Sequence, residues 1–412
     1  MKYSQGVQTD ELQQVVDRLA AQLGRSVAID DPQLRLLAVS RHFGDEDALR
    51  VRAVMQREAD PSEKARMLSH GIADWDRPGR VPGDAEKGIK PRVCVPIREH
   101  GLLLAYLFLI DESVEDWEIA RATTAAVSIG LLLYRRLVLH ERQQSREEAL
   151  LRDLIAADPA VRARAGEEVD EEGLLKSLEQ AMVMVIELVD TPPALESAEV
   201  ALRAATEHAR RIEPPGTVLT VVQGRRALLL RGGDRLSDAT GRALAQNVIA
   251  EVQSQADVGR CVAGLGTVRS GPDAAAVSHE QARVAARAAG VLPSLGDVTA
   301  WEDLGVYAFL LKLSPRDLSP TLYPPGLRAL VERGHADSLL DTAEAYLDCA
   351  GDATRAAAAL HIHRSTLYYR LERIEKATGM DLRDGRNRLT LHLGIKLTRL
   401  VGAYAELADD AS

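Results

Sequence analysis

The sequence has few cysteines, and they are widely separated. Cys94, Cys261 and Cys349 form no C-x-x-C pair and no even-numbered framework. This pattern argues against a secreted disulfide scaffold and against a clustered-thiolate zinc site. A reducing compartment is therefore expected.

Targeting signals and membrane-spanning runs are also missing from the sequence. The start, MKYSQGVQTDELQQVV, lacks the basic and then apolar segments of a signal peptide. Of the most apolar stretches, 102–110 is too short to span a bilayer and 125–139 is interrupted by Arg135 and Arg136. We expect a cytoplasmic protein that does not associate with membranes.

The length and charge limit the architecture. A chain of 412 residues, 46% of them apolar, predicts about two to four domains, each with its own core. The formal net charge is −10, so the whole molecule does not attract nucleic acid or anionic lipid. Any contact with phosphate must come from a local basic patch.

The first part of the chain has a sensor-like α/β pattern. Apolar runs at 25–30 and 34–40, and again at 91–98 and 102–110, flank turn residues and predict two hairpins. Between them, 45–88 starts with a helical stretch (ALRVRAVMQREA) and continues as a loop, either over a ligand cavity or as a surface excursion.

A long helical pattern follows at 115–157. Leu137, Leu150, Leu151 and Leu154 form a thin apolar stripe on a charged background. This stripe predicts a connecting or dimer-forming helix, with a solvated linker as the alternative. We expect 161–173 to be a charged spacer.

The middle of the chain, 181–290, has the element order βαββαβα. Its strands are expected at 181–190, 217–222, 226–230 and 257–266, with a turn at 223–226. Its helices are expected between TPP (191–193) and PPG (214–216), at 238–255 and at 273–290. That order predicts a ferredoxin-like palm domain, which occurs in cyclases, polymerases and many proteins that are not enzymes.

We find no catalytic or metal site in the sequence. The tetrapeptide Arg231–Asp234 (RGGD) is expected after the second hairpin strand, whereas the turn itself holds Arg225 and Arg226, where a cyclase needs metal-binding carboxylates. These two arginines could bind an anionic ligand or form an exposed basic turn. Gly264 and Gly266 lack the rest of a dinucleotide fingerprint, and Cys94 is expected in a core.

The last part of the chain is helical and begins after a proline-rich boundary at 312–326. Asp352 can cap a short Ala-rich helix, and a second helix follows a break at His361. In the second helix Leu367, Leu371 and Ile374 form one buried stripe, so Ser365, Tyr369, Glu372, Arg373 and Lys376 must face outward. Two short helices at a sharp angle are typical of a domain that enters the DNA major groove.

Local charge favours the same interpretation. From 352 to 400 there are ten basic and five acidic residues, a net +5, which leaves −15 on the remainder of the chain. One basic module on an acidic body is expected when that module contacts phosphate. A helical hairpin with a solvated basic face is the alternative. His361 and His363, two residues apart across the break, do not share a helical face as a chelating pair would.

The run AAAALHIHRSTLYYRLERIEKATGMDL resembles the C-terminal helix-turn-helix of the PucR (CdaR-like) family of bacterial transcription regulators. The pattern A-x-x-L-x-x-H-x-x-T-L-x-Y-R-L-x-R-I is matched by Ala357, Leu360, His363, Thr366, Leu367, Tyr369, Arg370, Leu371, Arg373 and Ile374. The run is also similar to Fis-type helix-turn-helix domains, in which glycine commonly occupies the turn; this chain has His361 there. Asp352 stands where the family usually has asparagine. The resemblance implies a degenerate GGDEF-like domain at 181–290 and, more weakly, a GAF- or PAS-like sensor at 25–110.

These inferences define a multidomain α/β plus all-α protein with four parts: a GAF/PAS-like sensor domain with an N-terminal helix (1–140), a long connecting or dimer helix (115–160), a degenerate GGDEF-like domain (176–312) and a helix-turn-helix domain (325–405). We expect a one-component transcription regulator that is not an enzyme and needs no cofactor or metal. It is expected to bind double-stranded operator DNA as a homodimer or higher oligomer, and to respond to a small-molecule effector under the 45–88 segment.

The expected DNA-contacting residues are Arg355, His363, Arg364, Ser365, Thr366, Tyr368, Tyr369, Arg370 and Arg373. Of these, Ser365 and Tyr369 are expected to point at base edges, and Arg355, His363, Arg370 and Arg373 at phosphates. The alternatives are a nucleotide-signalling enzyme or receptor and a protein-interaction module that does not bind DNA.

Overall fold

The computed structural model describes residues 2–45, 47, 61–189, 195–254, 259–313, 323, 325–334 and 338–410. The chain divides into two compact units, 1–144 and 145–412. The two units are described separately below.

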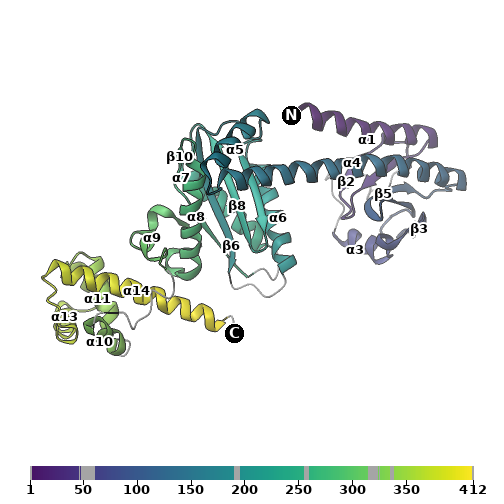
Figure 1. Cartoon of the computed structure of the whole chain (residues 1–412). Helices are drawn as coiled ribbons and strands as arrows, with labels where there is room; N and C mark the ends of the chain where they lie inside the picture. Colours follow the sequence, from purple (N-terminus) through teal and green to yellow (C-terminus); the bar gives the residue numbers. More distant parts are fainter. Residues whose placement is uncertain are drawn as a thin grey trace. The chain divides into compact units, whose positions relative to one another are not determined.

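The N-terminal unit is built on an antiparallel sheet with strand order β2-β1-β5-β4-β3 (Figure 1). Both predicted hairpins form: β1 pairs with β2 and β4 pairs with β5. The strand bounds are β1 Val27–Asp30, β2 Leu36–Val39, β3 Gly79–Val81, β4 Arg92–Glu99 and β5 Leu102–Ile110.

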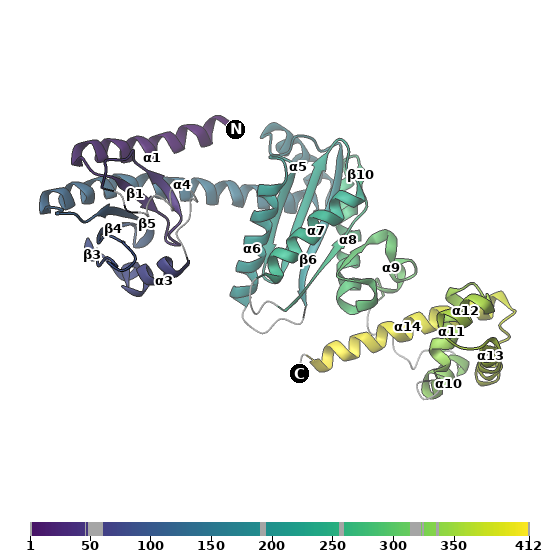
Figure 2. The ribbon, with the colours of Figure 1, turned by 180° about the vertical axis from the view of Figure 1, so that it is seen from behind.

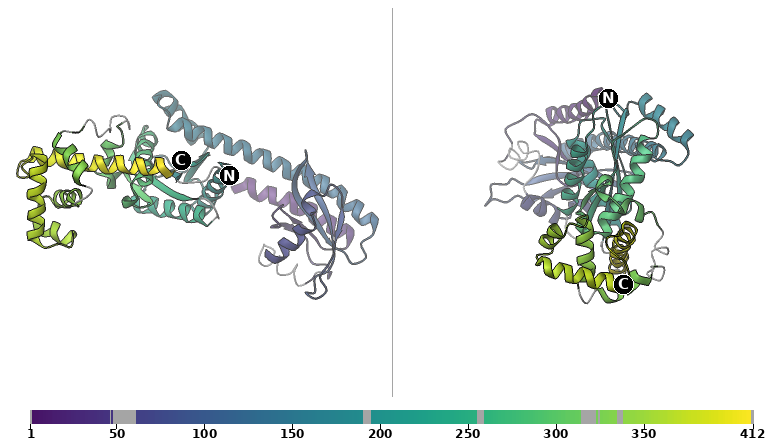
Figure 3. Two further views of the ribbon diagram at one scale, coloured as in Figure 1. Left: turned by 90° about the horizontal axis from the view of Figure 1, so that it is seen from below. Right: turned by 90° about the vertical axis from the view of Figure 1, so that its left-hand side faces the viewer.

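Alternating side chains give this sheet two apolar faces. Helices α1 (Lys2–Leu23) and α4 (Asp116–Leu154) run along one face (Figure 3), where Val93, Val95 and Leu107 meet the apolar side chains of both helices. The intervening residues, among them Cys94 and Tyr106, point to the other face, toward α3 (Pro61–Ser69) and the 3₁₀ turn η1 (Ile72–Asp74). Burial raises the pKa of the Cys94 thiol, as expected for a core residue rather than a nucleophile. The helix predicted at 48–59 lies outside the described residues.

Helix α4 has buried leucines at its C-terminal end. Leu150, Leu151 and Leu154 are almost fully buried in the core of the middle domain. They are therefore not available for a dimer contact, and the expectation that they form one was wrong. The expected charged spacer was also wrong, because 161–173 is occupied mostly by α5 (Pro159–Glu171), which buries Ala165 and Val169 against the same core.

The middle domain is a sheet with strand order β11-β9-β6-β8-β7, to which β10 adds by pairing with β6. Helices α6 and α7 cover one face of the sheet and α8 covers the other (Figure 2). The strand bounds are β6 Gln180–Val189, β7 Val218–Gln223, β8 Arg226–Gly233, β9 Arg260–Leu265, β10 Arg269–Ser270 and β11 Val298–Ala300. The helix bounds are α6 Leu195–Ile212, α7 Asp238–Gln253 and α8 Ala274–Val291.

Two details of this domain bear on the sequence predictions. The hairpin turn between β7 and β8 contains Gly224 and Arg225, as predicted. However, Arg231, Gly232 and Gly233 lie within β8 and pair with β6, so the RGGD segment does not follow the strand as expected. Antiparallel pairing with β6 from Gln180 to Glu187 extends β8 beyond the end of its apolar run.

The C-terminal domain is all helical. After α8 the chain forms the 3₁₀ turns η2 (Pro293–Leu295) and η3 (Trp301–Leu304) and the short helix α9 (Tyr307–Leu310). Most of the predicted proline-rich boundary lies outside the described residues. The helices beyond it are α10 Pro325–Gly334, α11 Leu339–Asp348, α12 Ala353–Ala359, α13 Arg364–Thr378 and α14 Gly385–Asp410.

Candidate nucleic-acid interface

Helices α12 and α13 are joined by a tight turn centred on His361. Asp352 caps α12, its carboxylate accepting from the backbone N–H groups of Thr354 (2.8 Å) and Arg355 (3.1 Å). These backbone hydrogen bonds hold the pKa of Asp352 below its usual value. His361 has φ 53°, the left-handed conformation usually given to glycine. The break predicted at His361 is therefore present, and it ends α12.

The buried face of α13 fixes how the helix lies in the domain. Leu367, Leu371 and Ile374 are buried together with side chains from α10, α11 and α14. Ala356 and Ala357 of α12 are buried in the same cluster, where their small size allows close approach. The predicted stripe is thus confirmed, and the opposite face of α13 is turned to solvent.

The leading end of α13 is exposed. Arg364, Ser365, Thr366, Tyr368 and Tyr369 are all solvent-exposed. The two tyrosines are 54% and 62% exposed, and the guanidinium of Arg373 lies 6.0 Å from the ring centre of Tyr369. Each of these side chains can donate a hydrogen bond, and the helix N-terminus adds partial positive charge. The surface formed by Arg364, Ser365, Thr366, Tyr368, Tyr369 and Arg373, here called the α13 face, therefore suits contact with bases and phosphates.

The structure shows side-chain contacts for His363 and Arg370, two of the residues predicted to contact DNA. His363 is the N-cap of α13: its Nδ1 accepts from the Ser365 backbone N–H (3.3 Å) and lies 2.8 Å from the Ser365 Oγ. Arg370 is partly buried and donates through Nη1 to the Thr342 hydroxyl (3.1 Å). Arg355 is exposed on α12. The phosphate contacts expected of these residues stay predictions, and two of the three side chains already help to hold the domain together.

The basic surplus of this domain is only partly available to DNA. Lys396 bonds to Glu344 (2.8 Å) and Asp348 (2.9 Å), and Arg399 to Glu344 (3.0 Å) and to Asp341. The three carboxylates lie on α11, before the 352–400 segment whose charge was counted. Their contacts hold α14 against α11, so the cation count overstated the positive charge that this domain exposes to solvent.

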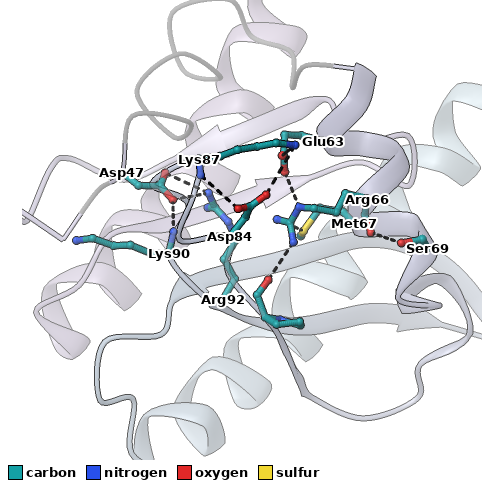
Figure 4. Close-up of polar contacts among 10 residues, drawn as sticks. Asp47, Glu63, Arg66, Met67, Ser69, Asp84, Lys87, Lys90 and Arg92 are labelled. Carbon is teal, nitrogen blue, oxygen red and sulfur yellow. Dashed lines mark hydrogen bonds and ion pairs between the residues drawn. The ribbon is translucent and has the colours of Figure 1, made fainter.

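A second polar site lies in the N-terminal unit, in the region predicted to bind an effector (Figure 4). Arg92 donates through Nη2 to both oxygens of Asp47 (3.1 and 3.0 Å), and both side chains are buried. The buried carboxylate of Glu63 accepts from Arg66 Nε (2.8 Å) through Oε2, while its Oε1 has no hydrogen-bond partner among the described residues and lies 3.8 Å from the Lys87 ammonium. This ion pair offsets part of the cost of burying a carboxylate oxygen without a hydrogen bond.

The short capped helix, the left-handed turn and the outward-facing second helix define the C-terminal domain as a helix-turn-helix of the DNA-binding class. The comparisons with known proteins agree with this geometry. Residues 339–397 match the PucR C-terminal helix-turn-helix domain, and residues 175–288 match the GGDEF-like domain.

Similar proteins of known role cover nearly the whole chain. The DNA-binding transcriptional activator AdeR of Bacillus subtilis is 21% identical over 95% of this chain and 94% of its own length. The proline-responsive transcriptional activator PutR of the same organism is 20% identical over 94% of this chain and 97% of its own. The purine catabolism regulatory protein of that organism is 34% identical over 22% of this chain and 18% of its own. The chain is a DNA-binding transcriptional regulator of the PucR type.

Proposed function

We propose that the protein binds operator DNA as a homodimer, reads bases with the α13 face and responds to a small molecule bound by its N-terminal unit. The observation that carries the DNA-binding part is the exposure of the α13 face on a helix whose other side is fixed in a core. A cytoplasmic location fits this role.

For base recognition, the proposal assigns Ser365 and Tyr369 to base edges and Arg364 to the first contact as the helix enters the groove. Each good base contact contributes about 1–3 kcal/mol of discrimination, roughly 5- to 150-fold in affinity. Fluorescence anisotropy with the promoter region of its own gene should show binding at physiological salt and much weaker binding to random DNA.

The variant test uses Arg364→Ala combined with Tyr369→Ala. The double variant should lose at least about tenfold in operator affinity. Arg269→Ala, an exposed arginine on β10 of the middle domain, serves as the matched control and should bind normally. Equal binding of operator and random DNA by the unaltered protein would refute the proposal.

The dimer contact that we propose lies on residues 117–138 of α4. Trp117, Thr124, Leu131 and Val138 recur at seven-residue intervals, and Val127 lies beside them. Trp117, Val127 and Leu131 are 52%, 59% and 56% exposed. Such an exposed heptad seam matches pairing with a second copy of the same helix. By length and composition α4 is also apolar enough to cross a membrane.

Sedimentation velocity distinguishes these possibilities. We expect a dimer for the unaltered chain, a monomer for Val127→Glu combined with Leu131→Glu, and a dimer for Gln143→Glu, an exposed position on a different side of α4 from the seam. Co-flotation with lipid vesicles together with a monomeric state in solution would contradict the dimer proposal.

The effector part of the proposal rests on the N-terminal unit. Its strand order, β2-β1-β5-β4-β3, supports a GAF- or PAS-like sensor, just as the order β9-β6-β8-β7 supports a ferredoxin-like arrangement in the middle domain. The buried Glu63 Oε1, which lies 3.8 Å from the Lys87 ammonium, could accept from an ammonium or amide group of a ligand. Because PutR is proline-responsive by name, free amino acids including proline are the first probes for a thermal-shift screen of the full chain. The same screen with Glu63→Gln should give weaker shifts, and a flat response in both proteins would count against this site.

The middle domain has no proposed catalytic role. Arg225 and Arg226 occupy the β7–β8 turn region where a cyclase would need metal-binding carboxylates. Incubation with GTP and magnesium should yield no cyclic dinucleotide.

A further inference from the structure

The middle domain contains a cationic cavity on the α8 side of its sheet. The cavity measures about 650 Å³, a size within the usual range for small-molecule sites. Four segments far apart in the sequence supply its charged walls: the end of β6, the start of β8, one face of α8, and the residue two beyond α9. The charged lining residues are Glu187, Arg226, Glu280, Arg283, Arg287 and Lys312.

The charges in this lining do not cancel. Arg226 forms an ion pair with Glu187 across the β6–β8 ladder, and Arg283 pairs with Glu280 one helical turn away (2.9 Å). Among the described lining residues there are four cations and two carboxylates, a net +2. An excess of this kind attracts anions to the cavity.

The cations are also arranged to converge. Positions 283 and 287 are four residues apart, so Arg283 and Arg287 project from the same face of α8. Arg287 donates through Nη1 to the carbonyl of Leu311 (3.4 Å), which holds its guanidinium at the cavity wall. The Lys312 ammonium lies 5.3 Å from the ring centre of Trp301. Guanidinium groups held in this way can bind oxyanions through paired N–H donors.

We propose that this cavity binds a phosphate-bearing small molecule. A phosphate dianion matches the excess charge of the lining, and its oxygens match the donors of Arg226, Arg283 and Arg287. Val284 and Leu311 supply an apolar wall for the rest of the ligand. The site differs from the effector site proposed for the N-terminal unit and from any catalytic use of the β7–β8 turn.

The apolar wall also connects the cavity to the helix-turn-helix domain. Val284 and Leu311 belong to a buried cluster that includes Leu400 of α14. Leu397 of α14 packs against this cluster and against the core that holds α13. A ligand that shifts α8 against α9 would therefore act on the helix that supports the recognition helix. This regulatory part rests on the proposed DNA-binding function, whereas the binding site itself does not.

The binding test is isothermal titration of the full chain with inorganic pyrophosphate in magnesium-free buffer. We expect one site per chain. Arg283→Gln combined with Arg287→Gln should weaken binding at least about tenfold, because two charge-assisted contacts are lost. Lys312→Gln, an exposed position, should weaken binding without a risk to folding, and Arg269→Gln on β10 should have no effect.

Citrate at matched ionic strength tests for a phosphate-bearing ligand. Tight binding of pyrophosphate and weak binding of citrate supports the proposal. Equal binding of both anions, or pyrophosphate binding that survives both the double variant and Lys312→Gln, overturns it.

The regulatory part is tested by operator affinity with and without pyrophosphate at constant ionic strength. We expect a change of at least about fivefold in the unaltered protein and none in the Arg283→Gln, Arg287→Gln variant. Unchanged operator affinity despite bound pyrophosphate overturns the coupling. Failure to bind operator without pyrophosphate is a separate result, which refutes the proposed function instead.

Discussion

The turn of the helix-turn-helix offers a sharp test, because His361 in the turn and Gly379 at the end of α13 adopt the same left-handed backbone conformation with different residues. His361 has φ 53° and Gly379, which ends α13, has φ 68°. The left-handed conformation costs a non-glycine residue about 1–2 kcal/mol. Glycine avoids that cost. However, it makes the unfolded chain more flexible, and the extra conformational entropy lost on folding lowers the stability by about 0.4–1 kcal/mol. The difference leaves a net of about 0.5–1 kcal/mol in favour of glycine at each position.

We therefore predict opposite effects from two opposite substitutions. His361→Gly should stabilise the domain by that amount, because the imidazole is exposed and little contact is lost. Gly379→Ala should destabilise it by a similar amount, and no atom lies within 4 Å of the added Cβ, so the effect comes from the backbone alone. Amide exchange of α13 peptides, measured by mass spectrometry on the full chain, should slow about threefold in the first variant and quicken about threefold in the second. Faster exchange in His361→Gly would refute the reasoning, since it would mean that the His361 side chain stabilises the turn more than its backbone strains it.

Three further predictions concern the packing and ionic contacts. Leu367→Ala should cost about 2–5 kcal/mol in urea unfolding, because the side chain is fully buried, whereas Leu389→Ala, at a position 62% exposed, should stay within about 0.5 kcal/mol. Gly264→Ala should lower the unfolding temperature of the middle domain, since the new Cβ would collide with the backbone of α8; an unchanged calorimetric transition would contradict this. Burial by itself raises the pKa of Asp348. The hydrogen bonds from Lys396 and His392 lower it by more, so the pKa lies below the usual 3.8. The ionised carboxylate of Asp348 therefore stabilises the fold above its unfolded-state pKa, and this stabilisation is lost as the pH falls through the lower pKa of the folded state. In an acid titration followed by circular dichroism, the stability of Asp348→Asn should depend less on pH below about pH 5 than that of the unaltered protein.

The features that the sequence predicted well are those set by local periodicity. The stripe of Leu367, Leu371 and Ile374, the cap at Asp352 and both hairpins of the N-terminal unit follow from spacing within a few residues. The break at His361 was also predicted from the residues around it, and it depends on one backbone angle.

The features that were missed depend on partners distant in the chain. Nothing within the leucine stripe of α4 shows that Leu150 and Leu151 are covered by α5 and the middle sheet, so exposed and buried leucines look alike in the sequence. The thin apolar content of α5, with Ala165 and Val169 alone buried, resembles a solvated spacer. The three carboxylates of α11 changed the local charge balance only once α14 was seen to pack on α11.

The cationic cavity could not be predicted from the sequence, because its lining residues are also distant from one another in the chain. The sequence places Arg226 in a basic turn. Arg283, Arg287 and Lys312 reach the same cavity only because the sheet and α8 bring their segments together. In α8 alone the arginines resemble the solvated face of any amphipathic helix.

The two sides of α13 are independent in a way that invites protein engineering. Because the anchoring leucines and isoleucine take no part in the outward surface, randomising Arg364, Ser365, Tyr368 and Tyr369 would vary the contact chemistry while the scaffold keeps its fold. Selection from such a library could retarget the regulator to new promoters without compensating repairs elsewhere in the chain.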